Sequence, residues 1–130
     1  MRGTLVALVF VGGGIGSVLR YGLATAVQRG LPGPFPAGTF AVNLLGSFAI
    51  GLVGALGLER AAISPEARVF LMVGILGGFT TFSSLAWETL GLLSVRDVLR
   101  AALYAGGSVL LGLAGAWLGR RLGRMGTGRT

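Results

Sequence analysis

The chain has 130 residues, of which 53% are hydrophobic and only 12% are charged, against about 25% charged residues in an average soluble domain. This inventory excludes a water-soluble globular fold, because too few charged residues remain to cover its surface. The basic residues are eleven arginines, and four acids leave a net charge of +7. These arginines lie at the ends of apolar runs instead of lining one polar face. They therefore predict membrane topology and headgroup contact, with no nucleic-acid partner.

Neither cysteine nor histidine occurs in the chain. Their absence excludes disulfides, thiolate catalysis and thiolate metal sites, together with the side chain that most often serves as a general base or metal ligand. The sequence also offers no pair of buried acids for acid–base work. We therefore do not expect an enzyme.

Four stretches are long and apolar enough to cross a membrane as helices, which takes about 20 residues each. In chain order they cover residues 4–27, 37–58, 67–93 and 98–122, and a basic tail follows at 123–130. A signal peptide is the alternative for the first stretch, because Arg2 precedes an apolar run. The length of that run favours a span. The sequence thus predicts a single all-α membrane domain with four transmembrane helices, in a multi-pass protein of the cell (inner) membrane.

Local signals set the starts of the later spans. Three prolines between residues 32 and 36 predict a loop before the second span. Ser64 is a candidate N-cap and Pro65 suits the first helical position of the third span. Asp97 is a candidate cap for the fourth.

The arginines outside the tail are balanced across the predicted membrane. Three lie on the side of both termini and three on the other side: Arg2, Arg60 and Arg68 against Arg29, Arg96 and Arg100. Only the carboxyl-terminal end of the fourth span and the tail, with Arg120, Arg121, Arg124 and Arg129, tip the positive-inside rule toward a cytoplasmic amino terminus. A near-balanced chain can insert either way, so a pair of opposed subunits stays open, although the tail weakens it.

Small residues recur four apart in every span. The pairs are Gly12 with Gly16, Ser47 with Gly51, Gly74 with Gly78, and Gly115 with Gly119. Such pairs allow helices to approach closely in lipid. Each pair taken singly favours packing between spans of this chain over packing between subunits. Together the pairs predict a compact, oligomeric bundle.

Residues 74–84, Gly-Ile-Leu-Gly-Gly-Phe-Thr-Thr-Phe-Ser-Ser, lie in the middle of the third span. Two adjacent glycines and two adjacent threonines predict that the helix is interrupted here, with the break at Gly77-Gly78. Backbone unwound at membrane depth must be buried or line a wet cavity, and its carbonyls can coordinate a cation. A packing kink is the alternative.

Polar side chains form stripes on two spans. Thr39, Asn43 and Ser47 share a face of the second span, and Tyr104 and Ser108 share a face of the fourth. Either they hydrogen-bond between helices or they line a conduction path. Together with the interruption they favour a path.

Two charged residues lie more than one helical turn from the ends of their spans. Arg20 either snorkels to headgroups or forms an anion-attracting vestibule. Glu88 lies either at a pore mouth or near the interface. Hydroxyl and amide donors with an arginine suit an anion better than a cation.

The sequence resembles the Fluc/CrcB family of fluoride channels across all four spans. The resemblance is carried by Gly-Ile-Gly-Ser-Val-Leu-Arg-Tyr at residues 14–21, Gly-Thr-Phe-Ala-Val-Asn-Leu-Leu-Gly-Ser-Phe at 38–48, and Gly-Gly-Phe-Thr-Thr-Phe-Ser at 77–83. Tyr104 and Ser108 fit the family less distinctively.

The resemblance implies a dual-topology dimer of antiparallel subunits that conducts fluoride passively and lowers its cytoplasmic concentration. A structural sodium ion at the dimer centre would be held by the main-chain carbonyls of Gly77 and Thr80. The implied fluoride pathway includes Asn43, Phe82, Ser83, Ser84, Tyr104, Ser108 and the vestibule arginine Arg20. The implied partners are fluoride, sodium, the lipid bilayer and a second copy of the chain or a homologous subunit.

The chain departs from the family pattern at Leu85, where a second phenylalanine is usual. Either Phe82 and the hydroxyl and amide donors are enough to bind fluoride, or one fluoride position is weakened. Alternatively, a distinct partner subunit supplies the missing phenylalanine. Two other classes remain as alternatives. A proton-coupled exporter of the small multidrug type needs an acid in the first span, where this chain has Arg20, and a structural or non-conducting subunit would show no flux by itself.

Overall fold

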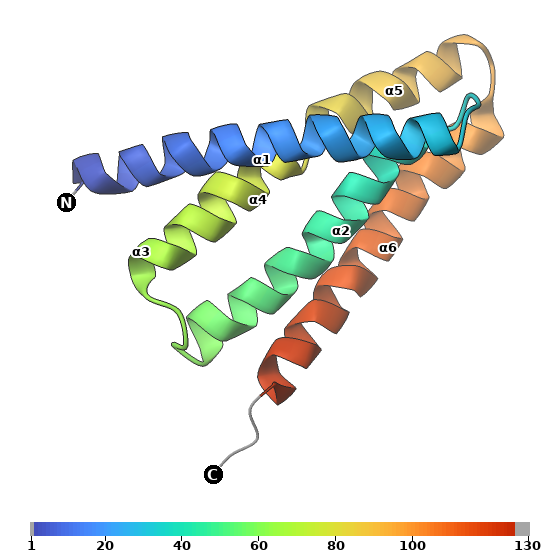
Figure 1. The fold of residues 1–130 in the computed structure, drawn as a ribbon. Coiled ribbons are helices and arrows are strands. Elements are labelled where there is room, and N and C mark those ends of the chain that lie inside the picture. Colours follow the sequence, from blue (N-terminus) through green and yellow to red (C-terminus); the bar gives the residue numbers. More distant parts are fainter. Residues whose placement is uncertain (1, 127–130) are drawn as a thin grey trace.

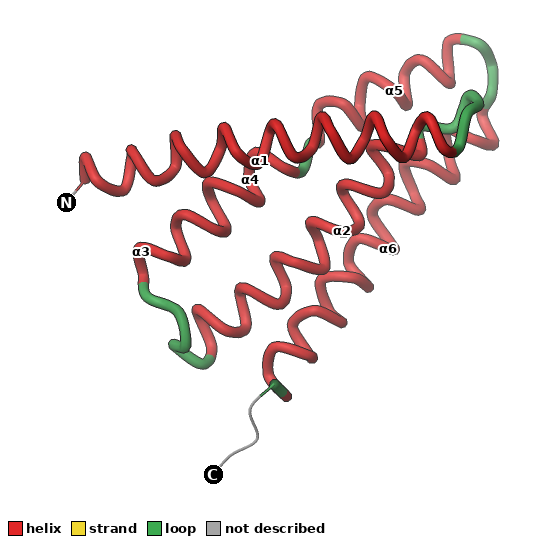
Figure 2. The backbone as a smooth tube through the Cα atoms, in the orientation of Figure 1, coloured by secondary structure: helices red, strands yellow, loops and turns green. Residues whose placement is uncertain are grey.

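The computed structural model describes residues 2–126. All regular secondary structure in this part of the chain is helical, and it contains no strand. The last four residues of the predicted basic tail, Arg129 among them, lie outside the described residues. In chain order the elements are α1 (Arg2–Gly30), α2 (Ala37–Gly54), η1 (Ala55–Glu59), α3 (Pro65–Arg68), η2 (Val69–Ile75), α4 (Leu76–Phe79), α5 (Phe82–Ser94) and α6 (Val98–Met125). The elements η1 and η2 are π-helical continuations of their neighbours (Figures 1 and 2).

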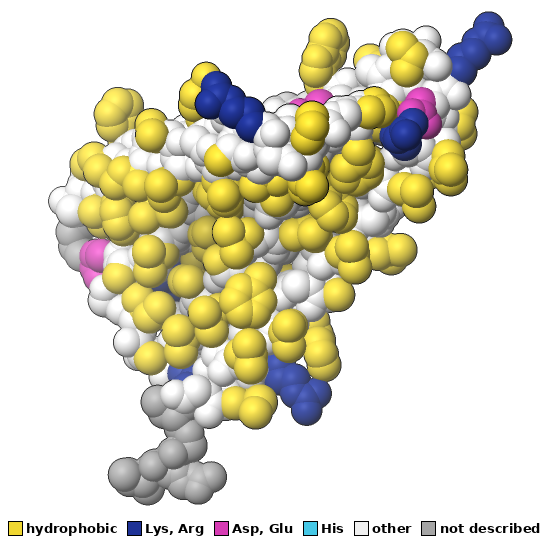
Figure 3. All heavy atoms as spheres, turned by 45° about the vertical axis from the view of Figure 1, so that its right-hand side comes forward, with side chains coloured by type: hydrophobic (Ala, Val, Ile, Leu, Met, Phe, Trp, Pro, Cys, Tyr) yellow, Lys and Arg dark blue, Asp and Glu magenta, His cyan; other side chains and the backbone are white. Residues whose placement is uncertain are grey.

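Four helical segments within residues 2–126 are long and apolar enough to cross a membrane. They run from Arg2 to Gly30, Ala37 to Glu59, Pro65 to Ser94 and Val98 to Met125. The prediction of an all-α protein with four membrane-length helices is confirmed. Hydrophobic side chains cover much of the face shown in Figure 3, as expected for a chain whose solvent is lipid.

The predicted helix starts are present as local hydrogen bonds. Ser64 Oγ accepts from the Ala67 amide at 3.1 Å, with Pro65 in the first turn. Asp97 accepts from the Arg100 amide at 3.2 Å and from the Arg100 guanidinium at 2.7 Å. This guanidinium hydrogen bond lowers the pKa of Asp97 below its usual value. The proline-rich loop contains Gly33 at φ +142°, a backbone angle that L-residues rarely adopt.

The helices form two close pairs. α1 crosses η2 and α4, and α2 runs side by side with α6 in the same direction (Figure 1). A Cβ at Gly16 would lie 2.0 Å from the Ile75 carbonyl oxygen, and one at Gly51 would lie 2.0 Å from that of Ala116. Backbones this close need glycine at the crossing. The small-residue pairs thus serve packing within the chain, as the sequence predicts.

The third membrane-length segment contains two non-helical residues. α4 ends at Phe79, Thr80 and Thr81 are extended, and α5 begins at Phe82. The sequence pointed to Gly77 and Gly78, and that location is wrong, because both residues are helical. Gly78 packs against α1, where a Cβ would lie 2.4 Å from the Gly13 carbonyl oxygen. The glycines therefore provide close contact, while the threonines leave the helix.

Candidate functional site

The extended residue Thr81 is held by the side chain of Asn43 on α2. Asn43 Nδ2 donates to the Thr81 carbonyl at 3.0 Å, and the Thr81 amide donates to Asn43 Oδ1 at 2.8 Å. The carboxamide thus satisfies both the amide and the carbonyl of Thr81, which the interruption removes from the helix. Nδ2 carries two protons and donates one here. Its second proton has no acceptor within residues 2–126.

Hydroxyl groups surround the first turn of α5. Thr81 Oγ1 caps this helix by accepting from the Ser84 amide at 3.1 Å, and it lies 3.1 Å from Ser84 Oγ and 3.4 Å from Ser83 Oγ. The Thr-x-x-Ser spacing explains the arrangement, because an N-cap side chain reaches the third residue after it. Ser83 and Ser84, both predicted for the fluoride pathway, therefore gather around Thr81.

A hollow of about 420 Å³ opens beside this junction, between α2, the extended threonines and α6. Its polar lining comes from Asn43, Ser47, Thr80, Thr81 and Ser108. The remaining lining is glycine or apolar: Gly46, Ile50, Leu76, Phe82, Leu85, Val109, Gly112, Leu113 and Ala116. No charged side chain lines the hollow, so any polar guest would meet hydroxyl and amide groups in apolar surroundings.

Ser108 supplies an unpaired hydroxyl to the hollow. Its side-chain oxygen is buried, and it has no hydrogen-bond partner within residues 2–126. A buried hydroxyl without a partner is costly, and native structures rarely leave one unless a ligand or water satisfies it. Ser108 is therefore placed to donate to a guest in this hollow.

Two side chains border the hollow differently. Phe82 is 80% exposed, so the single chain leaves its ring uncovered. Leu85 is 9% exposed and packs in a cluster with Leu92, Ala101 and Tyr104. Leu85, where the resemblance leads us to expect a second phenylalanine, thus contributes to the core of the chain as well as to the lining.

The carbonyl end of α4 lies behind the hollow. Arg20 Nε donates to the Gly78 carbonyl at 3.1 Å, and Thr80 Oγ1 donates to that of Leu76 at 3.0 Å. The carbonyl end of a helix carries partial negative charge, which suits a guanidinium. Within residues 2–126 neither the carbonyl of Gly77, which lies in α4, nor that of the extended residue Thr80 accepts a hydrogen bond from outside the helices.

Glu88 belongs to a separate polar network. It accepts from Thr39 Oγ1 at 2.8 Å and from the Tyr104 hydroxyl at 2.5 Å. Tyr104 is fully buried, and its ring packs edge-on against Phe35 with centroids 5.5 Å apart. Glu88 is thus bound by side chains of α2 and α6, and the Tyr104 hydroxyl is engaged away from the hollow.

The structure brings together only some of the residues predicted for the fluoride pathway and for the sodium site. Asn43, Thr80, Phe82 and Ser108 line one hollow, while Ser83, Ser84, Arg20, Gly77 and Tyr104 do not. Sequence reasoning did not select Thr81, although a threonine before a helical run is a capping signal. It also left open the role of Glu88, whose partners lie on other helices and share no local pattern with it.

Comparison with known proteins decides the family. Residues 7–120 match the family model described as CrcB-like protein, Camphor Resistance (CrcB). The chain belongs to the CrcB-like family. A relative from Thermus thermophilus, named fluoride-specific ion channel FluC, is 60% identical over 116 residues, which cover 89% of this chain and 92% of that protein. Another CrcB-like protein of that name, from Nitratidesulfovibrio vulgaris (strain Miyazaki F), is 49% identical over 120 residues, 92% of this chain and 97% of the relative.

The Asn43 contact leads to a stability prediction. Replacing Asn43 with leucine keeps the volume but leaves the Thr81 amide and carbonyl unpaired, at a cost of about 1–3 kcal/mol for each buried group. We expect a lower thermal unfolding temperature in detergent. Ser47→Ala is the matched control, because Ser47 lines the same hollow and makes no hydrogen bond within residues 2–126. Equal unfolding temperatures for the two variants would contradict the assigned role of Asn43.

Proposed function

We propose that this chain forms a fluoride-selective ion channel that lets fluoride leave the cell passively. The observation that carries the proposal is the hollow with the unpartnered Ser108 hydroxyl and the remaining Asn43 proton. The names of the CrcB-like relatives support it, since they are called fluoride-specific ion channels.

The chemistry of the hollow suits a small, strongly hydrated anion. Such an ion gives up its water only where closely placed donors replace it, and Asn43 and Ser108 supply donors without a fixed charge. An aromatic ring has a positive edge. Phe82, at the border of the hollow, can present that edge to the ion and stabilise it weakly enough for release.

Arg20 contributes to this proposal as an attracting charge. Its guanidinium has five N–H donors, of which Nε–H is engaged with Gly78. Held at the end of α4, the group raises the local concentration of anions without lining the hollow itself. Its position fits the proposed vestibule better than snorkelling to headgroups.

A second subunit completes the proposed channel. Phe82 is 80% exposed beside the hollow, and a second copy would cover this ring and close the path. The balanced arginines of the amino terminus and the loops support two orientations, so we propose an antiparallel dimer. A homologous partner that supplies a phenylalanine where this chain has Leu85 is the alternative composition.

A sodium ion fits the carbonyl oxygens left by the interruption. Those of Gly77 and Thr80 are hard oxygen ligands of the kind that alkali cations accept. Two copies of the chain would supply four such oxygens, and a bound ion would tie the subunits together. The purified dimer should therefore unfold at a higher temperature in sodium than in N-methylglucamine. Equal temperatures would contradict the sodium site.

Fluoride efflux from liposomes tests the function directly. Purified protein in fluoride-loaded liposomes should release fluoride, as measured with an electrode, and should not release chloride. Ser108→Ala and Phe82→Ala should slow the efflux by roughly 5- to 10-fold, the effect of about 1–1.5 kcal/mol on a rate.

Matched variants separate the path from general damage. Ser94→Ala removes an exposed hydroxyl that lies outside the hollow, and Phe10→Ala removes a ring that is 82% exposed. Both should conduct like the parent. Parent efflux no faster than that of empty liposomes would remove the channel proposal for the chain alone. Flux that follows an imposed proton gradient would favour the small multidrug exporter, although α1 contains no acid.

Single-cysteine labelling tests the antiparallel arrangement. The chain has no cysteine, and Met125 at the end of α6 is 63% exposed. An impermeant maleimide should therefore label Met125→Cys from both sides of the cell membrane. Labelling from one side only would exclude dual topology and require a differently oriented partner.

A further inference from the structure

The carboxyl-terminal end of α6 carries a second hollow, whose lining shares no residue with that of the first. It has a volume of about 300 Å³ and is lined by Trp117, Arg120, Arg121 and Arg124. All four side chains are exposed in the single chain. This feature is independent of the function proposed above.

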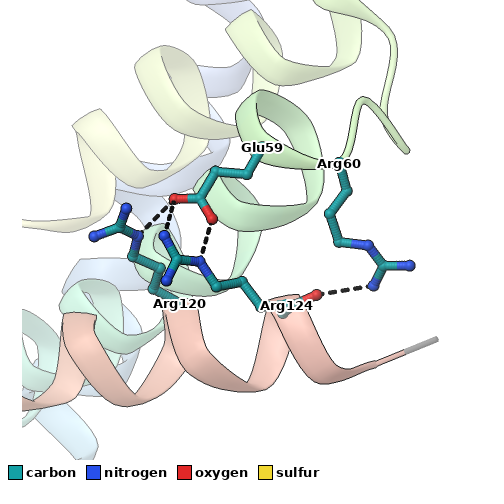
Figure 4. Close-up of polar contacts among 5 residues, drawn as sticks. Glu59, Arg60, Arg120 and Arg124 are labelled. Atoms are coloured by element: carbon teal, nitrogen blue, oxygen red, sulfur yellow. Dashed lines mark hydrogen bonds and ion pairs between the residues drawn. The ribbon is translucent and has the colours of Figure 1, made fainter. Parts of the chain in front are cut away.

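Glu59 orients two of these arginines. Arg120 Nε donates to Glu59 Oε1 at 2.6 Å, and Arg124 donates through Nε to Oε2 and through Nη2 to Oε1 (Figure 4). The same figure shows Arg60 reaching the Gly123 carbonyl from the other side, at 2.9 Å. One carboxylate faces three lining arginines, so two positive charges of the hollow remain uncompensated among the described residues. An anion would meet guanidinium groups that are already positioned.

Arg121 and Trp117 form the other wall. The Arg121 guanidinium carbon lies 5.3 Å from the centre of the Trp117 ring, a cation–π contact. Tryptophan is enriched where hydrocarbon meets headgroups, because its ring is apolar and its N–H is polar. The Trp117 ring thus places the hollow at the boundary between the hydrocarbon core and the headgroups.

The depth of the hollow follows from helix length. α6 has 28 residues, which at 1.5 Å each span about 42 Å, whereas the hydrocarbon core is about 30 Å thick. Because arginine is costly in hydrocarbon, the end that carries Arg120, Arg121 and Arg124 extends into the headgroup layer. There the anion within reach at high local concentration is a lipid phosphate, and arginine recognises phosphate through paired N–H donors.

We propose that this hollow binds the phosphate headgroup of an anionic phospholipid. Trp117 would lie against the upper acyl chain and glycerol, and the arginines would hold the phosphate. The site combines charge, an apolar wall and a defined volume, so it should select anionic over zwitterionic lipid beyond the general attraction of a positive surface.

Tryptophan quenching in reconstituted protein tests the site. The chain has two tryptophans, and Trp87→Phe leaves Trp117 as the reporter. Nanodiscs are prepared from phosphatidylcholine with a minority of phosphatidylglycerol. In one sample the phosphatidylglycerol carries bromine on its acyl chains, and in the other an equal amount of the phosphatidylcholine does. Brominated phosphatidylglycerol should quench Trp117 more than brominated phosphatidylcholine at the same mole fraction. Arg121→Gln should weaken that preference about fivefold, the effect of one arginine near a charged surface.

Arg29→Gln is the control, because it removes an equal charge from an exposed helix end outside the hollow. The preference should persist in Arg29→Gln. Equal quenching by the two lipids, or equal loss in both variants, would overturn the proposal in favour of general surface charge. Loss of the preference on adding excess inorganic phosphate would assign the hollow to free phosphate instead. Fluoride efflux by Arg121→Gln reports that the variant is folded.

Discussion

The pair of hydrogen bonds between Asn43 and Thr81 is the constraint on which the rest of the structure depends. Backbone groups opened inside an apolar environment must find partners, and a side-chain amide that both donates and accepts can replace two of them at once. With this partner in place, the chain can turn away from the helix at Thr80 and resume it at Phe82. The same turn borders the hollow that Ser108 faces, so shape and chemistry arise from a single contact.

Close approach of the helices fixes where that turn can occur. Gly16 and Gly78 allow α1 and α4 to pack backbone against backbone, so the segment up to Phe79 stays helical. The adjacent threonines lie beyond this contact and have side chains that compete for backbone hydrogen bonds. Thr81 uses this capacity to cap α5. Glycine and threonine therefore have separate tasks within a short stretch that looks uniform in composition.

The sequence predicts more of the fold than of the site. Span lengths follow from apolar runs, and the starts at Ser64 and Asp97 follow from capping chemistry, because both are encoded locally. The location of the interruption was wrong because glycine signals either a break or a close contact, and only the neighbouring helix decides. Tyr104 and Ser108 share a face of α6, yet one binds Glu88 and the other faces the hollow. Helical periodicity alone cannot separate them, since the difference depends on which helix lies opposite.

Asn43, the partner of Thr81, lies on α2 and so precedes Thr81 in the chain, which matters during biosynthesis. A nascent chain emerges amino terminus first, so Asn43 enters the bilayer before the residues that it will hold. The partner is therefore in place when the interrupted segment leaves the translocation machinery. A permuted chain that delivered the segment containing Thr81 first would expose unpaired backbone to lipid until its partner arrived. The order of the helices along the chain thus also sets the order in which backbone hydrogen-bond partners enter the membrane.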